Sequence, residues 1–276
     1  MTLALSLKIN DGVIIAADSA STYTMVGAHG TPIVAKVYYN ANKVFNLRKK
    51  LPIGATTWGL GSIGEMSMSS IVKDFRLEVS DQISEESTEY TVKDFAEQLK
   101  KYIFEDRWLP AFKDQADPAQ MGFMVAGYSY GQPLPELYQI YTDKNQIIGP
   151  EPIYEGEIGL AWRGQVEAIT RLLYGFSPLL PLILEHELGV PTEQVKQLIT
   201  VLSQRLTTSF MLPTMPLQDA IDAVEFLVEM TIQHSKFMGG AQVVGGPIDI
   251  AVITKHEGFK WIKRKHYFGR ELNPLD

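Results

Sequence analysis

The chain opens with two apolar segments that a tight turn separates. Apolar and polar residues alternate over residues 2–9, whereas residues 13–18 are apolar on both faces and end at the carboxylate of Asp18. Between them stands Asn10-Asp11-Gly12, a strong hairpin signal because Asn and Asp tolerate left-handed backbone and Gly adopts it without steric cost. The pattern therefore predicts a β-hairpin that brings residues near 2 and 18 side by side.

The same reasoning predicts elements along the rest of the chain. Strands are expected at residues 43–47, 53–58, 121–128, 136–141, 158–163, 248–253 and 259–262. Helices are expected at about residues 65–79, 92–112, 165–173, 192–206 and 216–237, and residues 22–42 look like a looser connection. The predicted order along the chain is strands, two helices, strands, helices and strands. A doubly wound parallel sheet would instead alternate strand and helix throughout. We expect an α+β fold, a four-layer αββα sandwich of two antiparallel sheets.

The length of 276 residues is compatible with one domain in a layered fold of this kind. No internal repeat or composition break divides the chain, so residues 1–276 are expected to form a single domain. Residues 175–215 are rich in Pro and Leu, and we expect a helical insertion there.

Composition narrows the class of protein. The apolar fraction is 45% and the charged fraction 21%, ordinary values for a soluble globular protein, and the net charge of −7 argues against a nucleic-acid partner. The chain has no cysteine, which excludes disulfides and thiolate chemistry. With no signal peptide and no apolar run of about 18 residues, a cytoplasmic protein without membrane contact is expected. The dispersed histidines predict no metal site, and no motif predicts a cofactor.

Thr2 is a candidate nucleophile that carries its own base. Methionine is generally removed before a small residue, which would leave Thr2 with a free α-amine of pKa near 7.7 to 8.0. The neutral amine can take the proton of the side-chain hydroxyl, which then attacks a carbonyl carbon. A threonine after the first methionine is common, however, so Thr2 alone does not indicate catalysis.

Asp18 and Lys43 are candidate partners of Thr2. The hairpin places Asp18 beside Thr2, and a carboxylate at the end of an apolar strand needs a partner, which Lys43 could supply. A cation near the amine would lower the pKa of that amine and favour its base form. Spacing alone leaves open the alternative that Asp18 caps a turn and that Lys43 is solvated.

A glycine-rich segment, Gly59 to Gly64, follows one predicted strand and precedes a predicted helix. Backbone N–H groups at such a turn can approach a developing oxyanion, and a helix N-terminus adds favourable potential. An ordinary strand-to-helix turn is the alternative. The segment lacks the Lys-Ser/Thr ending of a phosphate-binding loop.

Three sequence segments together resemble proteasome β-type subunits and their bacterial homologues. TLALSLKINDGVIIAADSAS is similar to the opening of that family, NKVFNL to its lysine strand and TTWGLGSIGE to its glycine turn. The resemblance covers roughly residues 2–75. It is weaker in FMVAGY and in the long helix that ends at Gly239-Gly240, which resembles the helix that closes the family's active site.

The resemblance implies an Ntn-hydrolase fold and a threonine-type endopeptidase. It makes Thr2 the nucleophile and base, Asp18 the supporting carboxylate, Lys43 the pKa-lowering cation and Gly61 the oxyanion donor, with Ser19 as a supporting hydroxyl. It also implies peptide or unfolded-protein substrates and self-association into a ring or spiral, and it leaves open an ATP-dependent unfoldase as a partner. No cofactor is implied.

The sequence departs from the family pattern at two places. The family supplies a serine from a Gly-Ser-Gly turn, and an Asp and a Ser before its Gly-Gly pair. Here the corresponding segments read AWRG, residues 161–164, and HSKFM, residues 234–238, where Ser235 could partly substitute. The sequence resembles a divergent bacterial proteasome homologue, of the ancestral β type or a neighbouring group, more than it resembles a standard subunit. A catalytically inactive structural subunit and an Ntn amidase for a small molecule stay open as alternatives.

Overall fold

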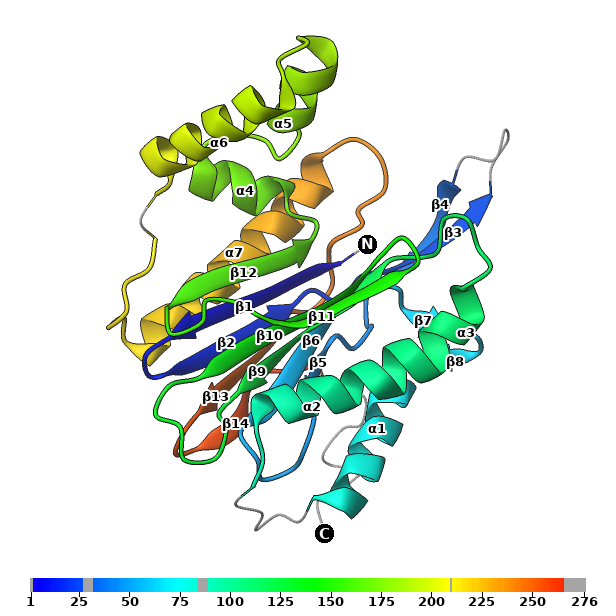
Figure 1. The fold of residues 1–276 in the computed structure, drawn as a ribbon, viewed down its shortest axis with the longest axis vertical. Helices are drawn as coiled ribbons and strands as arrows, with labels where there is room; N and C mark the ends of the chain where they lie inside the picture. Colours follow the sequence, from blue (N-terminus) through cyan, green and yellow to red (C-terminus); the bar gives the residue numbers. More distant parts are fainter. Residues whose placement is uncertain (1, 27–31, 84–88, 209, 266–276) are drawn as a thin grey trace.

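Two five-stranded antiparallel sheets form the centre of the molecule (Figure 1). The structure is a computed structural model that describes residues 2–26, 32–83, 89–208 and 210–265. The first sheet has the order β12-β1-β2-β13-β14. Its strands are β1 (Leu3–Ile9), β2 (Gly12–Ala17), β12 (Gly159–Gly164), β13 (Asp249–Thr254) and β14 (Gly258–Lys263).

The second sheet has the order β11-β10-β9-β6-β5. Its strands are β5 (Val44–Asn46), β6 (Ile53–Gly59), β9 (Met121–Gly127), β10 (Glu136–Asp143) and β11 (Gln146–Pro152). The predicted hairpin is present in the first sheet, where Ala4 pairs with Ala17. The α+β class with antiparallel sheets is thus confirmed.

Helices lie on the outer sides of the sheets. The helical elements are α1 (Met68–Gln82), α2 (Val92–Leu99), the π-helix η2 (Lys100–Trp108), α3 (Leu109–Phe112), α4 (Glu167–Tyr174), α5 (Leu180–Leu182), the π-helix η3 (Ile183–Glu187), α6 (Thr192–Leu206) and α7 (Leu217–Phe237). Elements α2, η2 and α3 follow one another without a break over the predicted range 92–112. In Figure 1, α1 and α2 lie on the side of β9 and β6, and α7 lies behind β1 and β12.

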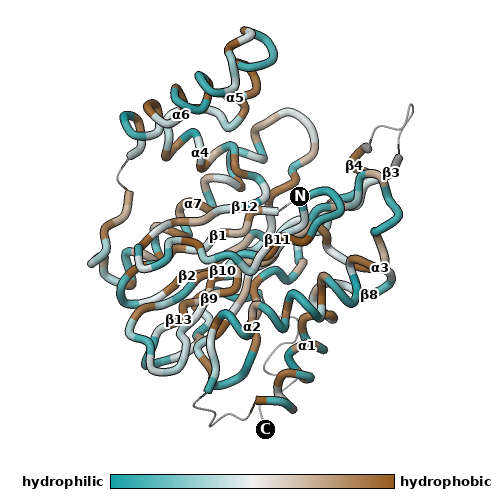
Figure 2. Tube along the Cα trace, in the orientation of Figure 1, coloured by the Kyte–Doolittle hydropathy of each residue, from teal (hydrophilic) through white to brown (hydrophobic). Residues whose placement is uncertain are grey.

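Apolar side chains bury both faces of β1 and β2. Leu3, Leu5 and Leu7 belong to a cluster shared with α4 and α7, whereas Ala4 belongs to a cluster shared with strands β5, β9 and β10 of the second sheet. A third cluster joins the second sheet to α1, α2 and η2. Figure 2 shows hydrophobic residues gathered along the central strands. Burial on both faces explains why residues 13–17 are continuously apolar rather than alternating.

The structure differs from the local predictions in three places. Residues 22–42 are not a loose connection, because they contain most of a hairpin of β3 (Ser21–Val26) and β4 (Pro32–Tyr38), whose loop lies outside the described residues. Strand β11 was not predicted. Helix α1 begins later than expected, because β7 (Ser62–Ile63) and β8 (Met66–Ser67) first form a small hairpin around Gly64, where φ is +58°.

Residues 175–215 carry α5, η3 and α6, of which α6 packs on α4 while α5 and η3 pack on α6, at a distance from the two sheets (Figure 1). The helices in residues 175–215 agree with the sequence expectation. That this segment is an insertion stays a prediction. Among the described residues, no helix combines the length and apolar character that crossing a membrane requires.

Candidate active site

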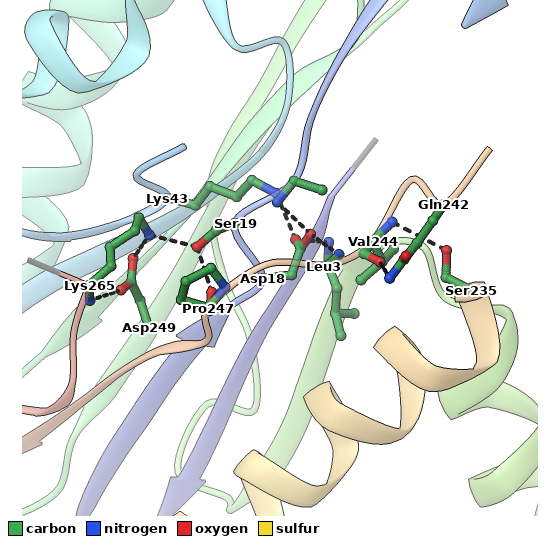
Figure 3. Close-up of polar contacts among 12 residues, drawn as sticks. Leu3, Asp18, Ser19, Lys43, Ser235, Gln242, Val244, Pro247, Asp249 and Lys265 are labelled. Carbon is green, nitrogen blue, oxygen red and sulfur yellow. Dashed lines mark hydrogen bonds and ion pairs between the residues drawn. The ribbon is translucent and has the colours of Figure 1, made fainter. Parts of the chain in front are cut away.

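The carboxylate of Asp18 gathers four hydrogen-bond donors at the end of β2 (Figure 3). Its Oδ1 accepts the Leu3 N–H at 2.9 Å and the Lys43 ammonium at 2.6 Å. Its Oδ2 accepts the N–H groups of Ala20 at 2.9 Å and Gly245 at 3.0 Å. An ionised carboxylate has about four acceptor positions, so these donors satisfy it in a place where it is fully buried. Sequence reasoning set a turn cap against an ion pair, and the structure contains both, because Asp18 accepts the Ala20 N–H two residues on and also pairs with Lys43.

Lys43 reaches Asp18 from the residue before β5 and is itself buried, with 5% of its surface exposed. Its carbonyl accepts the Thr57 N–H at 2.9 Å, which fixes it to the edge of β6. Burial lowers the pKa of the Lys43 ammonium below its ordinary value, the Asp18 charge opposes this, and the charge of Lys265 lowers the pKa further. The predicted contact between Asp18 and Lys43 is therefore present.

Thr2 lies immediately before β1 and is held by the backbone on both sides. Its carbonyl accepts the Gln165 N–H at 2.8 Å, and the N–H of the next residue, Leu3, is the one that Asp18 binds. Gly164 makes this approach possible, because a Cβ atom there would lie 1.8 Å from the Thr2 oxygen, and its φ is +88°. Thr2 is 5% exposed, so its place in the fold is tightly defined.

Thr2, Lys43 and Gly61 line one cavity of about 610 Å³. Strand β3, the end of β6 and the start of α1 supply most of the remaining wall, including Ala20, Ser21, Thr22, Thr57, Trp58, Ser67 and Met68. Gly61 is exposed, and its carbonyl accepts the Met68 N–H at 2.9 Å. The glycine turn does not lead directly into the helix, but the start of α1 still borders the cavity because the β7–β8 hairpin folds the chain back.

Ser19 and Ser235 are not among the described residues that line this cavity. Ser19 is fully buried, donates to the Pro247 carbonyl at 2.6 Å and accepts from the Lys265 ammonium at 2.7 Å. Ser235 lines a separate cavity and accepts the Val244 N–H at 3.3 Å. The structure therefore places both hydroxyls as supports of residues 244–247 rather than beside Thr2.

Sequence reasoning missed three residues that complete the surroundings of Asp18. The glycine whose N–H binds Asp18 is Gly245, whereas Gly239 lines the separate cavity that also contains Ser235. Asp249 and Lys265 form a second ion pair, with side-chain exposures of 3% and 6%. The sequence did contain a signal for this second pair. Asp249 is a carboxylate at the start of an apolar strand, just as Asp18 is a carboxylate at the end of one, and each needs a cation as partner.

Within residues 2–26, 32–83, 89–208 and 210–265, no three His, Asp or Glu side chains gather as a metal site. What the site does provide is a threonine, a buried ammonium and an exposed glycine backbone around one cavity. That set is suited to nucleophilic attack on a carbonyl group.

The fold is a proteasome-like one. No protein-family model and no curated protein matches the sequence. Among solved structures, the chain is similar to the Anbu complex from Pseudomonas aeruginosa, a helical assembly, with a TM-score of 0.52, 16% identity, and 96% of this chain and 88% of that chain covered. It is equally similar to an Anbu mutant from Hyphomicrobium sp. strain MC1, with a TM-score of 0.52, 16% identity, and coverage of 99% and 91%. At this identity the likeness concerns the fold.

Proposed function

We propose that this protein is a threonine-type peptidase whose nucleophile is Thr2, exposed by removal of Met1. The observation that carries the proposal is that Thr2, Lys43 and Gly61 share one cavity while Asp18 binds both Lys43 and the backbone of Leu3. Met1 lies outside the described residues. The proposal includes the αββα layering of an Ntn hydrolase and a cytoplasmic location.

The reaction needs no residue beyond Thr2 for proton transfer. The neutral α-amine of Thr2 accepts the hydroxyl proton while Oγ1 attacks the amide carbon. The tetrahedral adduct collapses, the C–N bond breaks, and the leaving nitrogen receives the proton from the amine. Water then attacks the resulting ester, again with the amine as base, which releases the acid and restores Thr2. The cation of Lys43 favours the neutral form of the amine.

Gly61 is the proposed donor to the oxyanion. It lines the cavity without a side chain, and Met68 at the start of α1 lines the same cavity. The partial positive charge of a helix N-terminus favours a developing negative charge nearby, and a single oxyanion-hole donor can be worth about 10²–10³ in kcat.

We further propose that the protein self-associates and acts on peptides or unfolded proteins. The Anbu complex of similar fold forms a helical assembly, which supports a ring or spiral here. An ATP-dependent unfoldase would then supply the unfolded chains. Light scattering tests the assembly, and a monomer at all concentrations would favour an Ntn amidase with a small-molecule substrate.

The decisive experiment is intact-mass analysis with and without an epoxyketone or β-lactone inhibitor, which requires a free N-terminal threonine. The expected result is loss of Met1 and one adduct mapped to Thr2, with no adduct on the Thr2→Ala variant. A Ser235→Ala variant is the matched control and should still be labelled, because Ser235 lines a different cavity. Retained Met1 would overturn the proposal, because the base would then be an amide.

An inactive structural subunit is the second candidate. It is favoured by one observation: neither Ser19 nor Ser235 is among the described residues that line the Thr2 cavity, so neither of these two candidate serines supplies a supporting hydroxyl there. A free Thr2 that no probe labels, in a protein that still assembles, would decide for this candidate.

A further inference from the structure

Arg163 is a half-buried cation without an acidic partner among the residues that the structure describes. It lies on β12, and its guanidinium donates to the Trp162 carbonyl at 2.9 Å and to Gln139 Oε1 at 2.5 Å. A guanidinium has five N–H donors, so these two bonds leave three for another group. The nearby carboxylate of Glu151 is bound by the Gln139 amide at 3.3 Å and not by Arg163.

No carboxylate among the described residues forms an ion pair with Arg163, although Asp143 lines the same cavity. Burial lowers the pKa of the guanidinium, and only the tyrosines Tyr154 and Tyr141 oppose this. Arginines in half-buried positions are usually paired with a carboxylate or a phosphate, because desolvation of the cation otherwise costs free energy. Arg163 is thus arranged to receive an anion.

Arg163 lines a cavity of about 370 Å³ in which Asp143 also takes part, and this cavity shares a wall residue with the cavity of Thr2. Trp58 lines both cavities, and its ring lies against Gly122, where a Cβ atom would come within 2.1 Å of it. The backbone also joins the two places, because Arg163 pairs with Ala4 and the next residue, Gly164, contacts the Thr2 carbonyl. A chain that lies along the Thr2 cavity can therefore continue past Trp58 to Arg163.

We propose that Arg163 is the anion-binding residue of a second subsite, which holds a carboxylate of the substrate whose amide bond Thr2 cleaves. This rests on the proposed function. The subsite has one cation with a planar set of donors, which suits a singly charged carboxylate bound in bidentate fashion. The carboxylate would be an Asp or Glu side chain or the C-terminal carboxylate of a peptide.

Binding to a Thr2→Ala parent tests the proposal without turnover. Four matched peptides are compared by calorimetry: one with an internal Glu, one with Gln in its place, and each with either a free or an amidated C-terminus. A charge-assisted bidentate pair should make the acidic member about tenfold tighter than its neutral match. The Glu/Gln and acid/amide comparisons separate the two sources of the carboxylate.

Substitutions at Arg163 assign the preference to that side chain. Arg163→Gln should bring the ratio of acidic to neutral affinities close to one, and Arg163→Lys should keep part of it, because the ammonium retains charge but not the planar donor pair. Arg171→Gln is the control, because Arg171 lies on α4 and pairs with Glu167 instead. Circular dichroism establishes that each variant is folded, and Arg163→Lys keeps the test valid if Arg163→Gln does not fold.

Two results would overturn the subsite. One is equal affinity of the parent for acidic and neutral peptides, including no binding of either. The other is an acidic preference that Arg163→Gln and Arg163→Lys leave intact. Because binding is measured on Thr2→Ala, a failure of inhibitor labelling at Thr2 would contradict the proposed reaction while the peptide comparison still reports on Arg163.

Discussion

The Nζ atom of Lys43 lies 2.6 Å from Oδ1 of Asp18 in a place where both side chains are almost completely buried. Two charges can be held there because three backbone N–H groups, from Leu3, Ala20 and Gly245, also bind the carboxylate. The pair joins the two sheets, since Asp18 follows β2 and Lys43 precedes β5. It is therefore a structural element as well as a part of the proposed active site.

Removing the ammonium of Lys43 should destabilise the protein strongly. Lys43→Met leaves Asp18 buried with no cation, and breaking a buried pair from one side costs about 3–5 kcal/mol of unfolding free energy. Urea unfolding measures the loss. Lys255→Met, at an exposed position in the turn after β13, should change stability by less than about 0.5 kcal/mol. A loss for Lys43→Met below about 1 kcal/mol would show that the pair contributes little.

Gly164 should resist even the smallest side chain. Gly164→Ala combines a φ of +88° with a Cβ atom 1.8 Å from the Thr2 oxygen, so we expect a loss of about 2 kcal/mol or more and weaker labelling of Thr2. Gly156→Ala is the matched control, with φ +67° and no atom within 4 Å of the added Cβ, and should cost about 1 kcal/mol. Equal losses for the two variants would refute the close approach.

Lys265 should support the site through the second ion pair. Lys265→Met removes the partner of Asp249 and of the Ser19 hydroxyl, and we expect a loss of about 3 kcal/mol. The matched control is Lys263→Met, whose pair with Glu225 is half exposed and should cost less than about 1 kcal/mol.

The same variant should also change the titration of Lys43. The charge of Lys265 lowers the pKa of Lys43, so its removal should raise that pKa and move the alkaline limb of the activity profile to higher pH. An NMR titration of the Lys43 ammonium measures the shift directly. An unchanged or lower pKa in Lys265→Met would contradict this electrostatic link.

Tyr128 should make stability fall at alkaline pH. Burial, assisted by the Asp11 charge, raises the pKa of its phenol from 10.0 to about 12. The pKa of Tyr128 is higher in the folded protein than in the unfolded chain. The neutral phenol therefore makes its full contribution to the free energy of unfolding below pH 10, and this contribution is lost as the pH rises towards about 12. Tyr128→Phe should flatten that part of the decline in unfolding free energy, measured in urea. An identical slope in both proteins would contradict the assignment.

Local sequence patterns predicted much of the fold, and within the site they predicted the hairpin that carries Asp18 and suggested its contact with Lys43. The Asn10-Asp11-Gly12 turn and the apolar run that ends at Asp18 were sufficient to predict the hairpin, because both signals are contained within neighbouring residues. The Lys43 contact could be suggested because a buried carboxylate needs a cation. The β3–β4 hairpin was missed because its strands are mostly exposed and polar residues interrupt their apolar pattern.

The remaining partners could not be predicted because they depend on long-range packing. The Gly245 N–H reaches Asp18 from 227 positions away, and a backbone donor carries no sequence signal. Lys265 is one of several basic residues at the end of β14, and only the fold distinguishes it from its exposed neighbour Lys263. The sequence also cannot tell whether Arg163 pairs with a carboxylate. That it does not do so among the described residues becomes evident only in three dimensions.

The four donors of Asp18 come from segments far apart in the sequence, and this has a consequence for synthesis. Thr2, Leu3 and Asp18 are translated long before Gly245, which follows Asp18 by 227 positions. Until then the carboxylate lacks one donor, and the strand that carries Asp249 has not joined β2. A growing chain therefore holds Asp18, and with it the backbone beside the proposed nucleophile Thr2, in an incomplete setting until residues 245–254 have been synthesised.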